Sequence, residues 1–190
     1  MGVKIVLKKT LAIIVIILLV VVVLFSFTLY KENSPISLDS VCLKLSDITE
    51  EGFKEYDAFY ITEPYIAPSV TLFAGWEIQE KYHVRFSKND SCFILIDLGK
   101  LKSTNDSEEF ISTIRESNFL FDFIEVPFDT IGDNSYVGKN ITDDFGPLVP
   151  VYFIVFKIDK IVAAVMCTGI SKESGINYAK IIESNIINFQ

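Results

Sequence analysis

The stretch Val151–Thr168 reads VYFIVFKIDKIVAAVMCT and decides the fold. Two apolar runs, Val151–Ile158 and Ile161–Thr168, flank the polar dipeptide Asp159-Lys160. Two strand-forming runs that are separated by two turn residues predict a β-hairpin. Because a hairpin joins antiparallel strands, we expect a mostly antiparallel sheet around it.

Further strand candidates lie upstream of this hairpin. Residues 78–86 alternate between apolar and polar side chains, with His83 and Arg85 on the polar face, as expected of a half-buried strand. The run CFILIDL at Cys92–Leu98 is apolar on both faces until Asp97, which is typical of a central strand. Residues 41–45 predict a first short strand, and 123–127 and 134–139 are weaker strand candidates. Residues 46–68 are rich in turn residues and predict a loop region.

Two segments change to the helical period. In Thr104–Phe119 the apolar residues Phe110, Ile111 and Ile114 form one stripe, and a second amphipathic pattern runs from about Lys172 to Ile187. Strands in hairpins with two covering helices predict an α+β fold, a mostly antiparallel β-sheet packed with two amphipathic helices.

The N-terminus carries a long apolar run, LAIIVIILLVVVVLFSFTLY at 11–30, with no charged residue. A helix of that length rises about 30 Å, the thickness of the bilayer core, so we expect an N-terminal transmembrane helix. Lys4, Lys8 and Lys9 precede it without any acid, which predicts a cytoplasmic N-terminus. A cleaved signal peptide remains the alternative, although the run is long for one.

The expected organisation has four parts. These are a cytoplasmic tail (1–10), a transmembrane helix in contact with the lipid bilayer (11–30), a polar tether (31–40) and an extracytoplasmic α+β domain (41–190). Of the 17 Lys and Arg, three precede residue 31 and no acid does, so residues 31–190 carry 14 − 25 = −11. This negative charge argues against a nucleic-acid partner, because phosphates need clustered Lys and Arg.

Few residues offer catalytic or metal chemistry. The chain has one His and three scattered Cys, which excludes a His/Cys zinc cluster. Asp143-Asp144 and the Asp129/Asp133 pair lack the spacing of a calcium loop. His83 has no Ser or Cys tied to it by a motif, and a His base needs a nucleophile nearby. We therefore expect no catalytic, cofactor or metal site, and a protein that is not an enzyme.

Two kinds of covalent modification fit an exported domain. Cys92 and Cys167 lie in apolar strands that are candidates for neighbours and for a disulfide, and three free buried thiols are the alternative. N-x-S/T sequons at Asn89, Asn105 and Asn140 are candidate glycosylation sites.

Aromatic residues gather in the predicted loop region. An exposed aromatic patch marks a binding surface, and core filling is the alternative. The candidates for contact with a partner are Phe53, Tyr56, Phe59, Tyr60 and Trp76.

Several short motifs resemble those of a known family. The stretch 46–53, SDITEEGF, resembles the S-D-L-P-E-G-[FW] opening of small secreted or anchored prokaryotic proteins, and Gly75-Trp76 and the stretch 131–136, IGDNSY, fit the same pattern. The fold family that the chain resembles is the PsbP/Mog1-like α/β/α sandwich. The resemblance implies an accessory subunit, an assembly factor or a binding protein.

Together these patterns predict a membrane-anchored, extracytoplasmic, non-catalytic binding domain. We expect it to act as an accessory or assembly partner of envelope proteins. The alternative is a small-ligand-binding extracytoplasmic domain, which needs a concave apolar pocket with a few polar groups.

Overall fold

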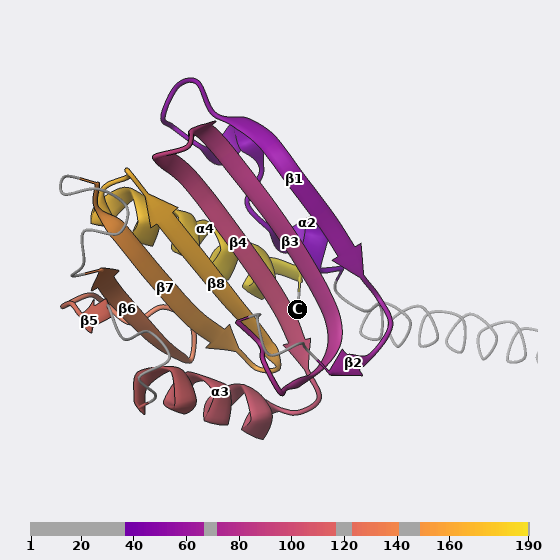
Figure 1. Ribbon diagram of the computed structural model, residues 1–190. Coiled ribbons are helices and arrows are strands. Elements are labelled where there is room, and N and C mark those ends of the chain that lie inside the picture. Colours follow the sequence, from indigo (N-terminus) through magenta and orange to yellow (C-terminus); the bar gives the residue numbers. More distant parts are fainter. Residues whose placement is uncertain (1–36, 67–71, 117–122, 141–148, 190) are drawn as a thin grey trace, which may run out of the picture. The chain divides into compact units, whose positions relative to one another are not determined.

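The computed structural model describes residues 37–66, 72–116, 123–140 and 149–189 (Figure 1). Its centre is the predicted hairpin, whose strands β7 (Val151–Ile158) and β8 (Ile161–Thr168) have the expected bounds. Ile158 pairs directly with Ile161, and Asp159 takes a positive φ of 50° in the two-residue turn between them. The hairpin prediction is confirmed.

Six further strands extend this hairpin into an eight-stranded sheet in which every pairing is antiparallel. The order across it is β1-β3-β4-β8-β7-β6-β5, with β2 paired to β3 beyond the end of β1 (Figure 1). The added strands are β1 (Lys54–Ile61), β2 (Tyr65–Ile66), β3 (Glu77–Asn89), β4 (Cys92–Leu101), β5 (Phe123–Glu125) and β6 (Asn134–Asn140).

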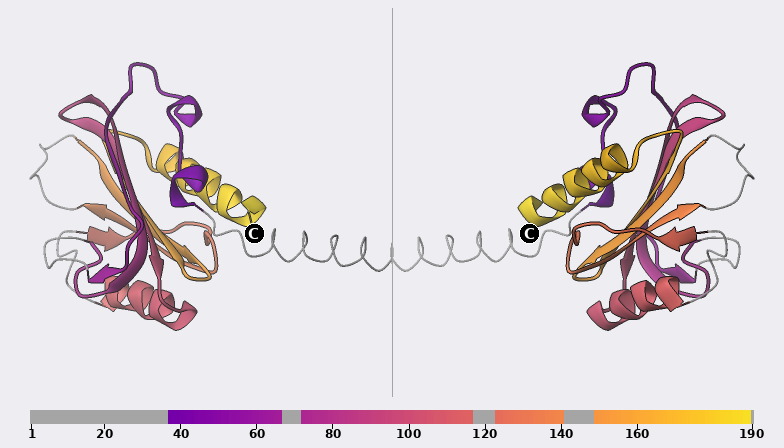
Figure 2. Two further views of the ribbon diagram at one scale, coloured as in Figure 1. Left: turned by 90° about the vertical axis from the view of Figure 1, so that its right-hand side faces the viewer. Right: turned by 90° about the vertical axis from the view of Figure 1, so that its left-hand side faces the viewer.

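The two long helices, α3 (Thr104–Glu116) and α4 (Lys172–Phe189), pack on opposite faces of the sheet (Figure 2). We call these faces the α3 face and the α4 face. Ser103 and Asp106 begin α3, since each accepts a hydrogen bond from the other's backbone N–H. Ser171 begins α4 by accepting a hydrogen bond from the N–H of Ser174.

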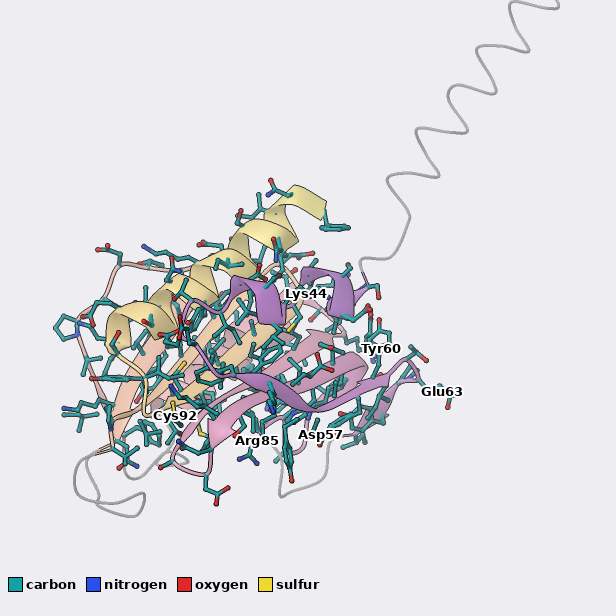
Figure 3. The ribbon with its side chains drawn as sticks, turned by 90° about the horizontal axis from the view of Figure 1, so that it is seen from above. Lys44, Asp57, Tyr60, Glu63, Arg85 and Cys92 are labelled. Carbon is teal, nitrogen blue, oxygen red and sulfur yellow. The ribbon has the colours of Figure 1, made fainter. Side chains whose placement is uncertain are left out.

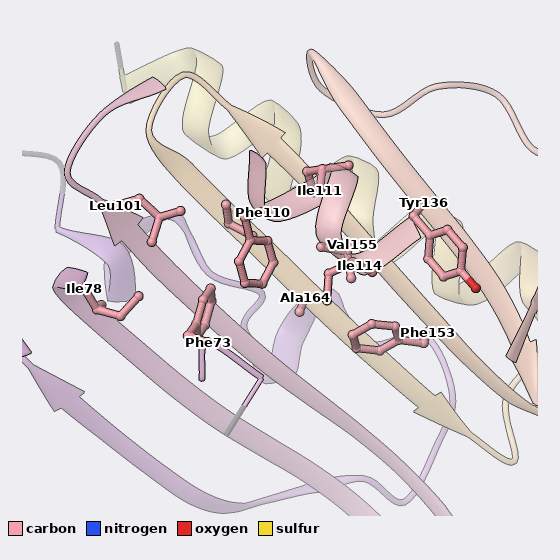
Figure 4. Close-up of a cluster of buried hydrophobic side chains, with 11 residues drawn as sticks. Phe73, Ile78, Leu101, Phe110, Ile111, Ile114, Tyr136, Phe153, Val155 and Ala164 are labelled. Atoms are coloured by element: carbon pink, nitrogen blue, oxygen red, sulfur yellow. The ribbon is translucent and has the colours of Figure 1, made fainter. Parts of the chain in front are cut away.

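The core on the α3 face is built around the helix stripe that the sequence predicts. Phe110, Ile111 and Ile114 are buried against β7 and β8, where Val155 and Ala164 belong to the same cluster (Figure 4). The core on the α4 face is separate, because side chains alternate along each strand. On that face α4 buries Tyr178, Ala179, Ile182 and Ile186.

The expected fold class, with an N-terminal transmembrane helix ahead of a sheet and two helices, is wrong. In the described residues, no helix is both long enough and apolar enough to cross a membrane; the longest, α4, carries four charged side chains. The predicted tail (1–10) and transmembrane helix (11–30) lie outside the described residues. The structure is a mostly antiparallel β-sheet with helices, of which α2 (Leu38–Val41) and η1 (Leu45–Asp47) are short.

Two local predictions near the start of the domain are also wrong. The expected strand at 41–45 is replaced by the short helices α2 and η1, and Leu38, expected in the tether, is fully buried. The expected loop region at 46–68 contains the eight-residue strand β1. Strand β1 is almost entirely exposed, so it lacks the alternating apolar pattern by which strands are found in sequences.

Candidate functional site

The most exposed regular element of the sheet is its edge strand, β1. It pairs with β3 on one side only, and seven of its eight residues are exposed. In an antiparallel pair every second residue points its N–H and C=O away from its neighbour. The outer side of β1 therefore presents backbone donors and acceptors that another strand can use.

Large apolar side chains collect at this edge. The described residues contain eight exposed large hydrophobic side chains, and four of them lie on β1 and β2. These four, which we call the edge patch, are Tyr56 (75% exposed), Phe59 (42%), Tyr60 (39%) and Ile66 (72%). Half of the exposed apolar side chains thus lie beside the free backbone edge.

The structure brings together three of the five predicted partner contacts. Tyr56, Phe59 and Tyr60 share β1, whereas Phe53, just before the strand, is buried. Trp76 packs edge to face on Phe110, with 5.6 Å between ring centroids, and lies partly buried against the α3-face core. Phe53 and Trp76 are therefore not part of the exposed edge.

Charge divides β1 into two halves. A β-bulge interrupts the register with β3 between Glu55 and Asp57, and both acids precede Ala58. Bulges and charges protect sheet edges against strand pairing. The remainder, Ala58–Ile61, pairs regularly with β3 and carries no charge. The uncharged half is the part of β1 suited to accept a further strand.

An ionic cluster lies beside β1 on the α3 face. The Lys81 ammonium is 2.8 Å from Oδ1 of Asp97, and Nδ1 of His83 is 3.1 Å from the same oxygen. Lys81 and Asp97 are buried. Burial raises the pKa of the Asp97 carboxyl, but the hydrogen bond with His83 and the charge of Lys81 outweigh it and bring that pKa below its usual range.

Aromatic rings cover this ionic cluster. Phe59 stacks on the His83 ring with centroids 4.7 Å apart, and the Lys81 ammonium is 5.5 Å from the Phe59 ring and 5.7 Å from the Phe73 ring. Phe73 fits there because Gly99 faces it: a Cβ at that position would be 2.7 Å from the Phe73 ring. The edge patch and the ionic cluster are thus joined through Phe59.

Sequence alternation correctly placed His83 and Arg85 on one face but did not identify Asp97 as their neighbour. The pairing of β3 with β4 sets Asp97 directly opposite His83. The register of this pairing depends on the turn at Asp90-Ser91 that joins the two strands. A shift of one residue in register moves each side chain to the other face.

The ionic cluster links β3 and β4 through the carboxylate that Lys81 and His83 share. A His–Asp pair serves as a base when a nucleophile lies on the other side of the imidazole. Among the described residues, no Ser or Cys is hydrogen-bonded to His83, whose ring instead stacks on Phe59. The same part of the chain contains no group of three or more metal-ligating side chains.

Asp133, one of the acids considered above for calcium, lies 3.7 Å from the Lys157 ammonium and accepts a hydrogen bond from the N–H of Asp159.

The predicted Cys92–Cys167 disulfide is not formed in the structure, where Cys42, Cys92 and Cys167 are free. Cys167 is buried on the α4 face beneath Gly175, whereas the Cys92 thiol is directed to the carbonyl of Gly169. Burial raises the pKa of Cys42 and of Cys167 to about 12, which keeps both thiols protonated.

The three predicted glycosylation sites lie on different elements. Asn89 is exposed at the end of β3, and Asn105 is exposed in the first turn of α3. Asn140 ends β6, and the rest of its sequon lies outside the described residues. These sites stay predictions.

Comparison with known proteins identifies the fold only. No family model matches the sequence, and no curated protein is significantly similar to it. The structure is similar to the extracellular domain of PknH from Mycobacterium tuberculosis, with a TM-score of 0.54 and 10% sequence identity over 78% of this chain and 94% of that one. The resemblance to PsbP/Mog1-like proteins stays a prediction.

Proposed function

We propose that the chain is an extracytoplasmic, non-catalytic binding domain that accepts an extended segment of an envelope protein as an added strand along β1. It acts as an accessory or assembly partner of that protein and contacts the lipid bilayer through residues 11–30. The observation that carries the proposal is the exposed edge strand with the edge patch along it.

Strand addition combines two sources of affinity. Backbone hydrogen bonds join the partner to the edge, and side-chain contacts on alternate positions give specificity. The uncharged half, Ala58–Ile61, supplies the backbone, and Tyr56, Phe59 and Tyr60 supply aromatic contact area. Aromatic residues are enriched at the centres of protein interfaces, which favours a protein partner.

The arrangement of the aromatic residues favours a protein over a small ligand. A small-ligand site would need Trp76 and the β1 aromatic residues to line one concavity. Trp76 instead packs on Phe110, while Tyr56 is 75% exposed on the edge. The aromatic residues of β1 are therefore exposed along the edge strand, with Phe59 on the α3 face beside His83 and Tyr60 on the α4 face beside Tyr82.

Two observations support an extracytoplasmic location. The lysines that precede the apolar run at 11–30 favour a cytoplasmic N-terminus. The fold is also similar to a domain that is described as extracellular. Protease added to intact cells should therefore digest the C-terminal domain; a domain that resists while other surface proteins are cut would contradict this location.

Photo-crosslinking in intact cells tests the binding edge. We expect p-benzoylphenylalanine at position 56 or 66 to give an adduct of one common mass, because both positions border the free edge. Positions 187 and 189 on α4, where Ile187 and Phe189 are 55% and 58% exposed, are matched controls that should give none. Ala58→Lys should reduce the adduct at least about fivefold by placing a charge in the uncharged half. Equal yields from all four positions, or no adduct from β1, would reject the proposal.

A further inference from the structure

Arg85 is held between two aromatic rings at the edge of the sheet. Its guanidinium carbon is 4.7 Å from the Phe93 ring on β4 and 5.2 Å from the Tyr56 ring on β1. Rings on both neighbouring strands orient a planar guanidinium through cation–π contacts. The orientation of the Arg85 donors is therefore set before any ligand arrives.

These donors are unused in the described part of the chain. Arg85 belongs to none of its ion pairs, and its Nε is buried without a hydrogen-bond partner. Arg115, the other arginine of the sequence, donates to the carbonyl of Ser135 at 2.6 Å and lies 3.7 Å from Glu125. In a domain with a charge of −11, an arginine without a carboxylate partner is unexpected.

No acid among the described residues forms an ion pair with Arg85. Asp97 on β4 is already bound by Lys81 and His83. Asp57 on β1 is directly opposite Arg85 in the register, but it is exposed and forms no ion pair with it (Figure 3). Lys81, His83 and Arg85 alternate along β3 on one face, and Arg85 is the basic side chain of this row that has no ion pair with a described acid.

We propose that Arg85 is a receptor for a carboxylate, namely an acidic side chain on the strand that adds to β1. This inference rests on the proposed function and names the chemistry of the partner. Guanidinium groups bind carboxylates through two parallel N–H···O bonds. Tyr56, which lies over the guanidinium, then contributes to the same contact.

The position of Arg85 fits such a partner. Its guanidinium lies beside the ring of Tyr56, two residues before the uncharged half, so a strand that pairs along Ala58–Ile61 and continues past it, about 4.8 Å beyond β1, passes Arg85. Side chains on alternate residues of that strand lie on the α3 face, as Arg85 does, so an acid there and the long Arg85 side chain extend toward each other across β1. Asp57 on β1 lies between β3 and the added strand, so its carboxylate competes with the partner's acid for the N–H donors of Arg85.

The test uses the full chain in non-ionic detergent and two nine-residue peptides of alternating Thr and Val, one with a central Glu and its twin with Gln. We expect the Glu peptide to bind about tenfold more tightly, and Arg85→Gln to abolish that difference. Arg85→Lys should keep only part of the difference in affinity between the Glu and Gln peptides, and Asp57→Asn should increase this difference about two- to threefold. Amide exchange of β1 reports strand addition, and the Nε–H resonance of Arg85 reports the anion, with that of Arg115 as internal control.

Acetate and inorganic phosphate separate the remaining outcomes. A saturable shift of the Arg85 resonance with acetate, without a shift of the Arg115 resonance, supports the carboxylate site. If neither peptide then protects the amides of β1 from exchange, strand addition is rejected and the carboxylate site is kept. Equal binding of the two peptides would overturn the carboxylate site and leave strand addition standing. The carboxylate site would also be overturned if the Arg85 resonance responded neither to acetate nor to either peptide, or if phosphate bound more tightly than acetate.

Discussion

Asp97 is the residue on which the ionic cluster depends. Its carboxylate is the acid bound by both Lys81 and His83, and Lys81 is buried. Asp97→Asn removes the charge and leaves Lys81 buried without a counter-ion, so we expect the free energy of unfolding to fall by about 3 kcal/mol. Urea denaturation of the full chain in detergent measures this change.

Glu77→Gln is the matched control for that substitution. Glu77 pairs with Lys102 at 3.2 Å, but both side chains are largely exposed, so its loss should cost less than about 1 kcal/mol. Because the pKa of folded Asp97 is lowered, its carboxylate stabilises the fold above the unfolded pKa of about 3.9, and this contribution is lost as the pH falls through the folded value. The difference between wild type and Asp97→Asn should therefore be constant near neutral pH and shrink below about pH 4. Equal losses in the two variants would contradict the role of the ionic cluster.

Helix α3 stabilises the fold through the packing of its buried face against the core. Phe110 is 1% exposed and contacts both Phe73 and Trp76. We expect Phe110→Ala to lower the free energy of unfolding by about 3–5 kcal/mol through the cavity it leaves. Phe189→Ala at the exposed end of α4 should change it by less than about 0.5 kcal/mol. Similar losses from both would show that α3 is not anchored by this side chain.

Strand β1, unlike helix α3, could not be predicted from the pattern of apolar residues in the sequence. Its residues KEYDAFYI have no buried face, because the strand is at the edge of the sheet and seven of its eight residues are exposed. Alternation in sequences records burial on one face of a sheet. An exposed edge strand has no such alternation. The sequence therefore predicted a loop where β1 lies, although it identified the aromatic residues of β1 as candidate contacts.

At the scale of the whole molecule, the negative charge sets the response to salt. Residues 31–190 carry 14 − 25 = −11, so the folded domain repels itself at low ionic strength. Raising NaCl from about 0.02 M to 0.3 M shortens the Debye length from roughly 20 Å to about 6 Å and should raise the melting temperature by a few degrees. Near pH 4.5, where carboxylates begin to be protonated, the increase should be smaller. A melting temperature that falls with salt at neutral pH would contradict this expectation.

The elements that bury one face or both could be predicted from the sequence: the hairpin β7–β8, the strands at Ile78 and Cys92, and the two amphipathic helices. Burial on one face imposes a period on the apolar residues, and burial on both faces gives a continuous apolar run, so both can be read along the chain. The tertiary structure alone decided which residues meet across strands. Asp97 faces His83, Arg85 lies between Tyr56 and Phe93, and Trp76 joins the core, because pairing register and strand order depend on contacts between segments that are distant in the sequence.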